Sequence, residues 1–184
     1  MPVFSRRSEP PSGQDNYQGY RQYVRGDFVE CCAYCLLHEL LAGGEDNFEL
    51  DHFQPQSKYR DFSWPQDFYN LYYACHVCNH YKSNSWPKPA LLREGYQFVD
   101  PCRDNFSDHF QADGSGHWAP VTRAAEYTEA RLRLNRRHLV EIRSLLTEIG
   151  SLRGIALDWN LPLKKQLEAL LPWLQSPITC PKTE

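Results

Sequence analysis

Apolar residues recur along the chain at two spacings, which predict two kinds of element. From residue 17 to residue 28 they return every three or four positions and so lie on one face of a helix. Residues 48–51 alternate apolar and acidic side chains, which is typical of a short strand, and residues 71–74 fit a second strand. The first half of the chain is therefore expected to combine helices with a small sheet.

The second half of the chain has the spacing of helices. Apolar residues over 121–149 predict one long amphipathic helix, or a helix broken near Asn135. A further helix is expected from Asn160 to about Pro172, because a Leu-Pro pair follows the asparagine and an apolar stripe follows that pair. The apolar faces of these helices should pack on the core or meet a partner.

Length and composition favour one compact core with unstructured ends. The chain has 184 residues, of which 41% are hydrophobic and 14% aromatic, and this is enough for a single buried core. Residues 1–16 are rich in Ser, Pro and Gly, and residues 175–184 contain two prolines, so both ends are expected to be flexible or disordered. The core is then expected over 17–100 and a helical extension over 101–174.

Charge, hydropathy and cysteine usage exclude several classes of protein. With 20 basic and 23 acidic residues the net charge is −3, so any surface that binds nucleic acid must be a local basic patch. No apolar run approaches the roughly 18 residues of a membrane helix, and no apolar segment follows Arg6 and Arg7 as a secretory signal requires. Four of the seven cysteines form two C-x-x-C pairs, which suits a reducing compartment, and a cytoplasmic location is expected.

The two C-x-x-C pairs predict a structural zinc site. Cys32 with Cys35, and Cys75 with Cys78, each place two thiolates where one tight turn can direct both at a single tetrahedral zinc ion. Cys31 is an alternative ligand. A site closed by four cysteines has no open position for water, so this zinc would hold structure rather than act in catalysis. Catalytic chemistry is to be sought in the 39 residues between the pairs and just after them.

Three short motifs lie in that region. They are an Asp-His-x-x-Pro stretch, a central asparagine and a Cys-Asn-x-x-Lys stretch, carried by Asp51, His52, Pro55, Asn70, Asn79 and Lys82. With the flanking cysteine pairs, these motifs resemble the HNH endonuclease family, and the resemblance runs from about Phe28 to Ser85. It implies an α+β fold, in which a small zinc-stapled ββα-metal motif is embedded in a mostly helical domain.

The same residues can be assigned roles from their chemistry. Phosphodiester hydrolysis needs an activated water, a cation that neutralises charge on the phosphate, and groups that hold both in line. A neutral His52 can accept the proton, while Asp51 and Asn79 offer hard oxygen ligands to magnesium or manganese. Asn70 could accept the hydrogen bond that fixes the His52 ring. The resemblance implies the same four roles, but many family members have His where Asn79 stands, which leaves the preferred metal open.

The substrate and its contacts are less closely specified. The resemblance implies DNA, although RNA stays open because nothing in the sequence reads bases. Lys82 and His80 are candidate phosphate contacts, and Arg136 and Arg137 belong either to a phosphate-binding face or to a solvated helix face.

Two interpretations of the function follow. The first is an HNH endonuclease that needs a protein partner such as an ATPase, by analogy with HNH proteins of bacterial defence systems. A partner is expected because the net acidic charge weakens binding to nucleic acid. The competing interpretation is a zinc-stapled adaptor that binds nucleic acid or protein without cleaving it. The intact motif residues argue against the adaptor.

Overall fold

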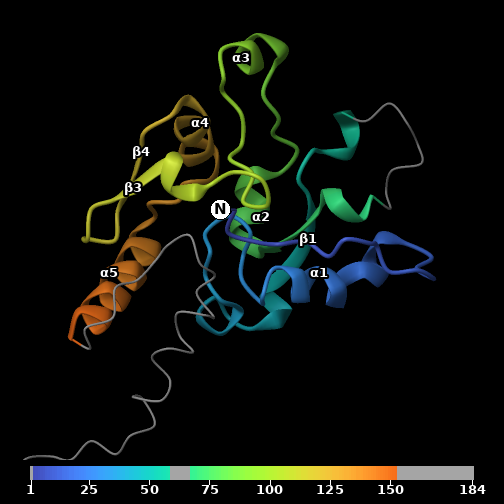
Figure 1. Ribbon diagram of the computed structural model, residues 1–184, viewed down its shortest axis with the longest axis horizontal. Coiled ribbons are helices and arrows are strands. Elements are labelled where there is room, and N and C mark those ends of the chain that lie inside the picture. The colour runs from blue at the N-terminus through green and yellow to red at the C-terminus, as the bar shows by residue number, and fades with distance from the viewer. Residues whose placement is uncertain (1, 59–66, 153–184) are drawn as a thin grey trace, which may run out of the picture.

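The computed structural model describes residues 2–58 and 67–152, which form helices and two small antiparallel strand pairs (Figure 1). The central pair is β1 (Phe48–His52) with β2 (Leu71–Cys75), and α2 (His76–Lys82) begins directly after β2. Both strands were predicted from the sequence, and the ββα order confirms the expected α+β fold with a zinc-stapled motif at its centre.

The strand pair is held in one register by aromatic packing. Phe48 pairs with Cys75 at one end and His52 with Leu71 at the other. All five residues of β2 are buried, and the Phe48 ring stacks on Tyr73 with ring centres 4.6 Å apart. Because side chains alternate along a strand, Glu49 and Asp51 share one face of β1, and on this face they contact Asn79 and Lys82 of α2.

The N-terminal helix forms where the apolar spacing predicts it. A 3-10 turn, Tyr17–Tyr20, continues into α1 (Arg21–Asp27), and Val24 at its centre is fully buried. The helix packs against the strand pair and so belongs to the same core as the ββα unit.

The segment before this helix is a correction to the sequence interpretation, which expected residues 1–16 to be disordered. Phe4 is only 1% exposed, packs against Phe28 and donates its backbone N–H to the carbonyl of Pro101 at 3.0 Å. Arg6 forms an ion pair with Asp27 at 3.1 Å. One buried aromatic ring and one buried ion pair are enough to order a stretch whose composition alone favours disorder.

The C-terminal half is more mixed than predicted. It contains α3 (Pro89–Arg93), β3 (Phe110–Ala112), β4 (Trp118–Pro120), α4 (Arg123–Leu132) and α5 (Arg137–Leu152). The expected break near Asn135 is confirmed, because Arg133 adopts a left-handed conformation with φ of 50° that ends α4. The β3–β4 hairpin was not predicted. The proposed helix from Asn160 and the tail from 175 lie outside the described residues.

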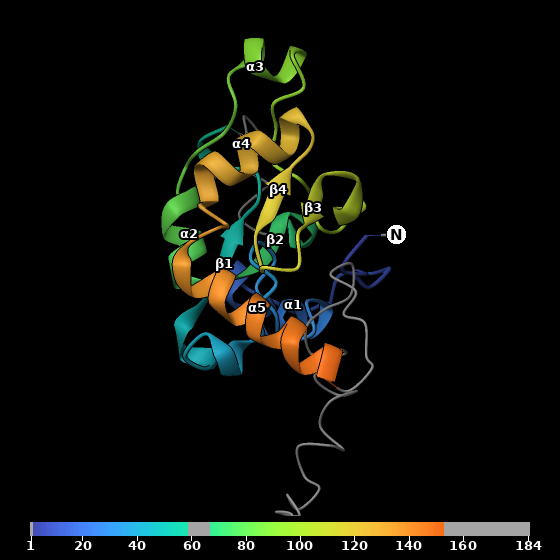
Figure 2. The same cartoon turned by 90° about the vertical axis from the view of Figure 1, so that its left-hand side faces the viewer.

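Buried contacts fasten the C-terminal half to the ββα unit. α4 packs on α2 (Figure 2). Arg143 of α5 is 1% exposed, lies 3.9 Å from the centre of the Trp118 ring, and donates to the carbonyls of Gly116 and Leu134 at 2.6 and 2.9 Å. The corner between α4 and α5 therefore has a fixed position beside α2.

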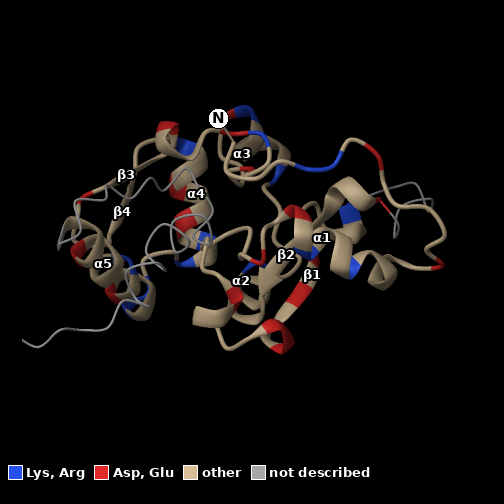
Figure 3. Ribbon diagram, turned by 60° about the horizontal axis from the view of Figure 1, so that its bottom comes forward, with Lys and Arg blue, Asp and Glu red and all other residues tan. Residues whose placement is uncertain are grey.

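Charged residues of both signs are interspersed over the described part of the chain (Figure 3). Lys and Arg occur on α1, near α3 and at the corner of α4 and α5, with acidic residues between them. Among the described residues, no helix combines the length and apolar composition that a membrane crossing requires.

Candidate active site and metal centre

The four cysteines of the C-x-x-C pairs meet in one buried cluster. The Sγ atoms of Cys32, Cys35, Cys75 and Cys78 all lie within 4.8 Å of one another, and those of Cys35 and Cys75 are 3.9 Å apart. A tetrahedral zinc ion with Zn–S bonds of about 2.3 Å places its sulfurs about 3.8 Å apart. The cluster thus fits a structural zinc ion, as the spacing predicted. Cys31 is buried but lies outside this group.

Backbone hydrogen bonds set the two cysteine turns against each other. Ala33 donates to the carbonyl of Tyr73 at 2.8 Å, which ties the first turn to β2. Leu36 closes that turn on the carbonyl of Cys32 at 3.0 Å. The N–H of Cys75 then points at the sulfur of Cys32 from 3.4 Å. The end of β2 and the start of α2 are therefore positioned by the same cluster.

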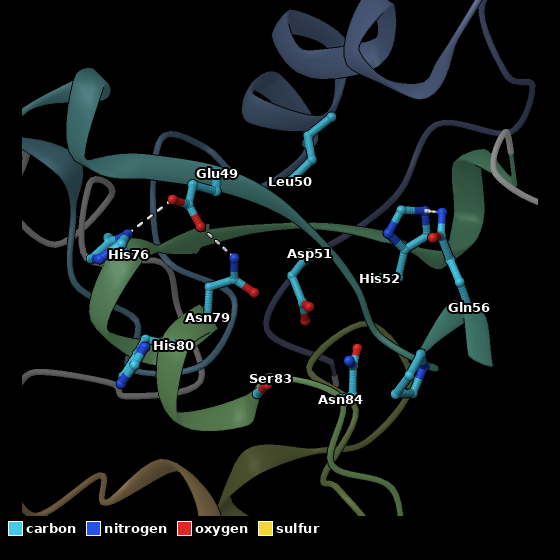
Figure 4. A pocket seen from close by; sticks show the side chains of 11 residues that line it. Glu49, Leu50, Asp51, His52, Gln56, His76, Asn79, His80, Ser83 and Asn84 are labelled. Atoms are coloured by element: carbon cyan, nitrogen blue, oxygen red, sulfur yellow. Dashed lines mark hydrogen bonds and ion pairs between the residues drawn. The ribbon is translucent and has the colours of Figure 1, made fainter. Parts of the chain in front are cut away.

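A cavity of about 390 Å³ opens between β1 and α2 (Figure 4). It brings together residues from β1, the loop after it and α2. The lining residues are Glu49, Leu50, Asp51, His52, Pro55, Gln56, His76, Asn79, His80, Ser83 and Asn84. Three of the four residues assigned to catalysis thus reach one cavity, and the asparagine at 70 does not.

Asp51 lies at the inner wall of the cavity in a buried ion pair with Lys82. The Lys82 Nζ is 2.8 Å from Oδ2 and 3.1 Å from Oδ1 of the carboxylate, and it also donates to the carbonyl of His52 at 2.8 Å. The hydroxyl of Tyr34, between Cys32 and Cys35, donates to the same carboxylate. Burial raises the pKa of Asp51 and lowers that of Lys82, while each partner opposes the shift of the other.

This pairing corrects the interpretation of Lys82 as a phosphate contact. Its side chain is 0% exposed, and its ammonium group is directed at Asp51 rather than at the solvent. The sequence placed Lys82 correctly on the helix after the second cysteine pair, but spacing alone did not show which side of that helix is buried.

His52 lies at the outer end of β1. The amide nitrogen of Gln56 lies 3.1 Å from its Nε2 (Figure 4). With this amide nitrogen as the donor, Nε2 of His52 is the acceptor of the hydrogen bond. The ring also packs edge-on against Tyr17, with ring centres 5.0 Å apart.

Asn70 acts on the loop that follows His52. Its Oδ1 accepts from the backbone N–H of Gln54 at 2.8 Å, and its Nδ2 donates to the carbonyl of the same residue at 2.9 Å. These hydrogen bonds replace the direct bond to the His52 ring that was expected from the sequence. Asn70 thus fixes the backbone two residues beyond His52.

Glu49 is a site residue that the sequence interpretation missed. It shares the α2-facing side of β1 with Asp51, and it accepts a hydrogen bond from Nδ2 of Asn79 while lying 2.9 Å from Nδ1 of His76 (Figure 4). Burial acts to raise the pKa of Glu49, but the hydrogen bonds with His76 and Asn79 outweigh it and lower that pKa. The two-residue spacing from Asp51 was the available signal, since it places both carboxylates on one face of a strand.

The other predicted substrate contacts, His80, Arg136 and Arg137, differ in their exposure and in their neighbours. His80 lines the cavity and is exposed. Arg137 is 91% exposed at its side chain but pairs with Glu141 at 2.7 Å. Arg136 is half-buried and donates to the sulfur of Cys78 at 3.3 Å. The side chains of Arg136 and Arg137 therefore have different neighbours, and their contact with phosphate stays a prediction.

A family model for HNH endonuclease matches residues 32–85, from the first cysteine pair to just past the end of α2. This segment of the chain is therefore similar to HNH endonucleases. Its two cysteine pairs, its β1–β2 hairpin and its cavity all lie inside the matched segment. The HNH domain supports a nuclease-type function in general. Comparison with curated proteins finds no match.

Proposed function

We propose that the HNH domain is a metal-dependent endonuclease that hydrolyses phosphodiester bonds in DNA. The observation that carries this proposal is the shared cavity, in which Asp51, His52 and Asn79 meet inside the segment that matches the family. The cavity is partly open to solvent, as hydrolysis of a polymer requires, and Glu49 on one wall contacts Asn79 of α2 on the other.

His52 is the general base of the proposed reaction. The Nε2 lone pair that accepts from Gln56 is also the one that takes the proton of an attacking water, so this water replaces the Gln56 amide at Nε2. The bonds between Asn70 and the backbone of Gln54 hold the loop that carries Gln56. His52 therefore depends on a positioned loop as well as on its own strand.

Asp51 and Asn79 are the proposed ligands of a divalent cation. When bound, such a cation neutralises charge on the scissile phosphate and on the leaving oxygen. A carboxylate and an amide oxygen are hard donors, which favours magnesium or manganese. Figure 4 shows both side chains directed into the same space. Because Glu49 accepts from Nδ2 of Asn79, the amide oxygen is left facing the cavity.

Lys82 and Tyr34 position the Asp51 carboxylate. A carboxylate has about four acceptor sites, so the two donors fix its plane and leave acceptor capacity for a cation. Tyr34 also connects this carboxylate to the first cysteine turn. The structural zinc and the catalytic groups are thereby joined through one buried side chain.

The charge distribution bears on how the nuclease reaches its substrate. Basic and acidic residues are interspersed on the described part of the chain, and the net charge is −3. Nucleic-acid affinity depends on the number of phosphates that basic groups neutralise. We therefore propose that a protein partner, such as an ATPase of a defence system, delivers the domain to DNA in the cytoplasm, where the cysteines stay reduced.

A plasmid-cleavage assay tests the function. Zinc-loaded protein is incubated with supercoiled plasmid, single-stranded DNA or RNA, in EDTA, magnesium or manganese. We expect metal-dependent nicking of DNA that is lost in His52→Ala and retained in His117→Ala, since His117 is exposed and lies outside the cavity. Equal nicking by the His52 variant would refute the assigned base. DNA binding without cleavage under every metal would instead support the zinc-stapled adaptor.

A further inference from the structure

The corner between α4 and α5 contains an arginine that reaches the cysteine cluster. Arg136 lies immediately before α5, and its Nη2 donates to the sulfur of Cys78 at 3.3 Å. Its Nη1 donates to the carbonyl of Leu132 at the end of α4. The guanidinium also lies 5.2 Å from the centre of the Tyr81 ring on α2. One side chain thus connects the cluster, α2 and both C-terminal helices.

The zinc-loaded cysteine cluster carries negative charge in the buried core, where a nearby cation stabilises it. Four thiolates around one Zn²⁺ carry a net charge of −2, and all four cysteines are buried. Uncompensated charge is costly in a buried setting, and a hydrogen bond from a charged donor to an anionic acceptor is among the stronger ones. Arg136 brings a permanent cation with several N–H donors to one of these sulfurs.

We propose that Arg136 is a positioning residue of the zinc centre, which stabilises the Cys78 thiolate and couples zinc binding to the docking of the C-terminal helices. The matched HNH segment ends at residue 85, so this contact comes from a part of the chain outside it. The inference rests on zinc in the cysteine cluster and is independent of the proposed nuclease activity. Coupling is reciprocal, so zinc stabilises the corner as much as the corner stabilises zinc.

Arg133 provides a matched control at the same corner. Its guanidinium lies 4.8 Å from the centre of the same Tyr81 ring, on a residue that is exposed. No hydrogen bond between Arg133 and a cluster sulfur occurs among the described residues, whereas Arg136 makes one. Replacing either arginine by methionine removes a cation from the ring, but only the change at 136 removes a donor from the sulfur.

The test measures zinc release from the full-length chain into a chromogenic chelator. We expect Arg136→Met to weaken zinc binding by about 10- to 100-fold, as loss of a partner to a metal ligand does, and Arg133→Met to stay close to the wild type. Arg136→Lys keeps the charge but lacks the planar fork that meets the sulfur and the Leu132 carbonyl with separate nitrogens, so zinc release should be faster than in the wild type.

Cobalt substitution supplies a readout that a purely structural role would not change. A hydrogen bond lowers the energy of the sulfur lone pairs, so its loss should shift the thiolate-to-cobalt charge-transfer absorption to longer wavelength in the Arg136 variants alone. Equal zinc release by the two methionine variants would overturn the proposal, because packing on Tyr81 would then account for both. If Arg136→Met does not fold, wild-type release and an unshifted cobalt spectrum in Arg136→Lys would overturn it.

Discussion

Replacing Lys82 by methionine should strongly destabilise the HNH domain. The substitution keeps an unbranched apolar stem, one heavy atom shorter, but removes the ammonium group that lies 2.8 Å from the Asp51 carboxylate. Asp51 is then left with the Tyr34 hydroxyl as its remaining side-chain donor, and the carbonyl of His52 loses a donor as well. Breaking a buried ion pair from one side costs about 3–5 kcal/mol, against a typical domain stability of about 5–15 kcal/mol.

Removing both charges should restore most of that loss. In Asp51→Asn with Lys82→Met, the amide oxygen still accepts from Tyr34 and no unpaired ion remains buried. Replacement of a complete buried pair by neutral groups is often close to neutral. Urea unfolding of the zinc-loaded single and double variants gives the coupling free energy, which we expect to exceed about 2 kcal/mol. A Lys82→Met variant within about 1 kcal/mol of the wild type would refute the argument that this pair is buried and mutually dependent.

Three further predictions concern the cluster, the amide ligand and the C-terminal half. Cys75→Ser should lose zinc and unfold the β1–β2 hairpin, because structural zinc contributes folding free energy directly. Metal analysis and a thermal melt measure both effects. Retained zinc with an unchanged Tm would contradict the four-cysteine zinc site. Glu49→Ala should weaken manganese binding, measured by calorimetry, because the Asn79 amide then loses the hydrogen bond that orients it. The Tm should change little, because the Glu49 side chain is exposed. Unchanged manganese affinity would remove Glu49 from the site. Gly116→Ala should cost more than about 2 kcal/mol, because φ is +86° and the added carbon would lie 2.2 Å from a backbone oxygen of α5. Gly114→Ala is its control, with φ of +76° and no atom within 4 Å, and an equal loss of stability in both variants would show that the close contact has no effect.

The sequence predicted those features that depend on neighbouring residues. The alternation in β1, the apolar run of β2 and the C-x-x-C turns are local patterns, and each appears where it was expected. The break between α4 and α5 was also predicted near Asn135. Local geometry decides these elements, so a single sequence suffices to predict them.

Features that depend on distant partners were not predictable. The sequence indicates a phosphate contact for Lys82, and the structure shows instead that Asp51, 31 residues earlier, faces it. The sequence indicates a phosphate contact for Arg136, and the structure shows a hydrogen bond to Cys78, which lies 58 residues earlier in the chain. The β3–β4 hairpin was missed because each of its strands has only three residues, too few to show a period.

The β1–β2 hairpin fixes the distance between the cysteine cluster and the proposed catalytic site. Its register places a zinc ligand beside Phe48 and the proposed base four residues further on, a separation of about 14 Å at 3.4 Å per residue. A side-chain replacement leaves that length unchanged, but one inserted residue would exchange the faces of the strand and present Leu50 to α2 in place of the carboxylates. Natural variation in this hairpin should therefore consist of substitutions, with insertions and deletions confined to the loop that joins the strands.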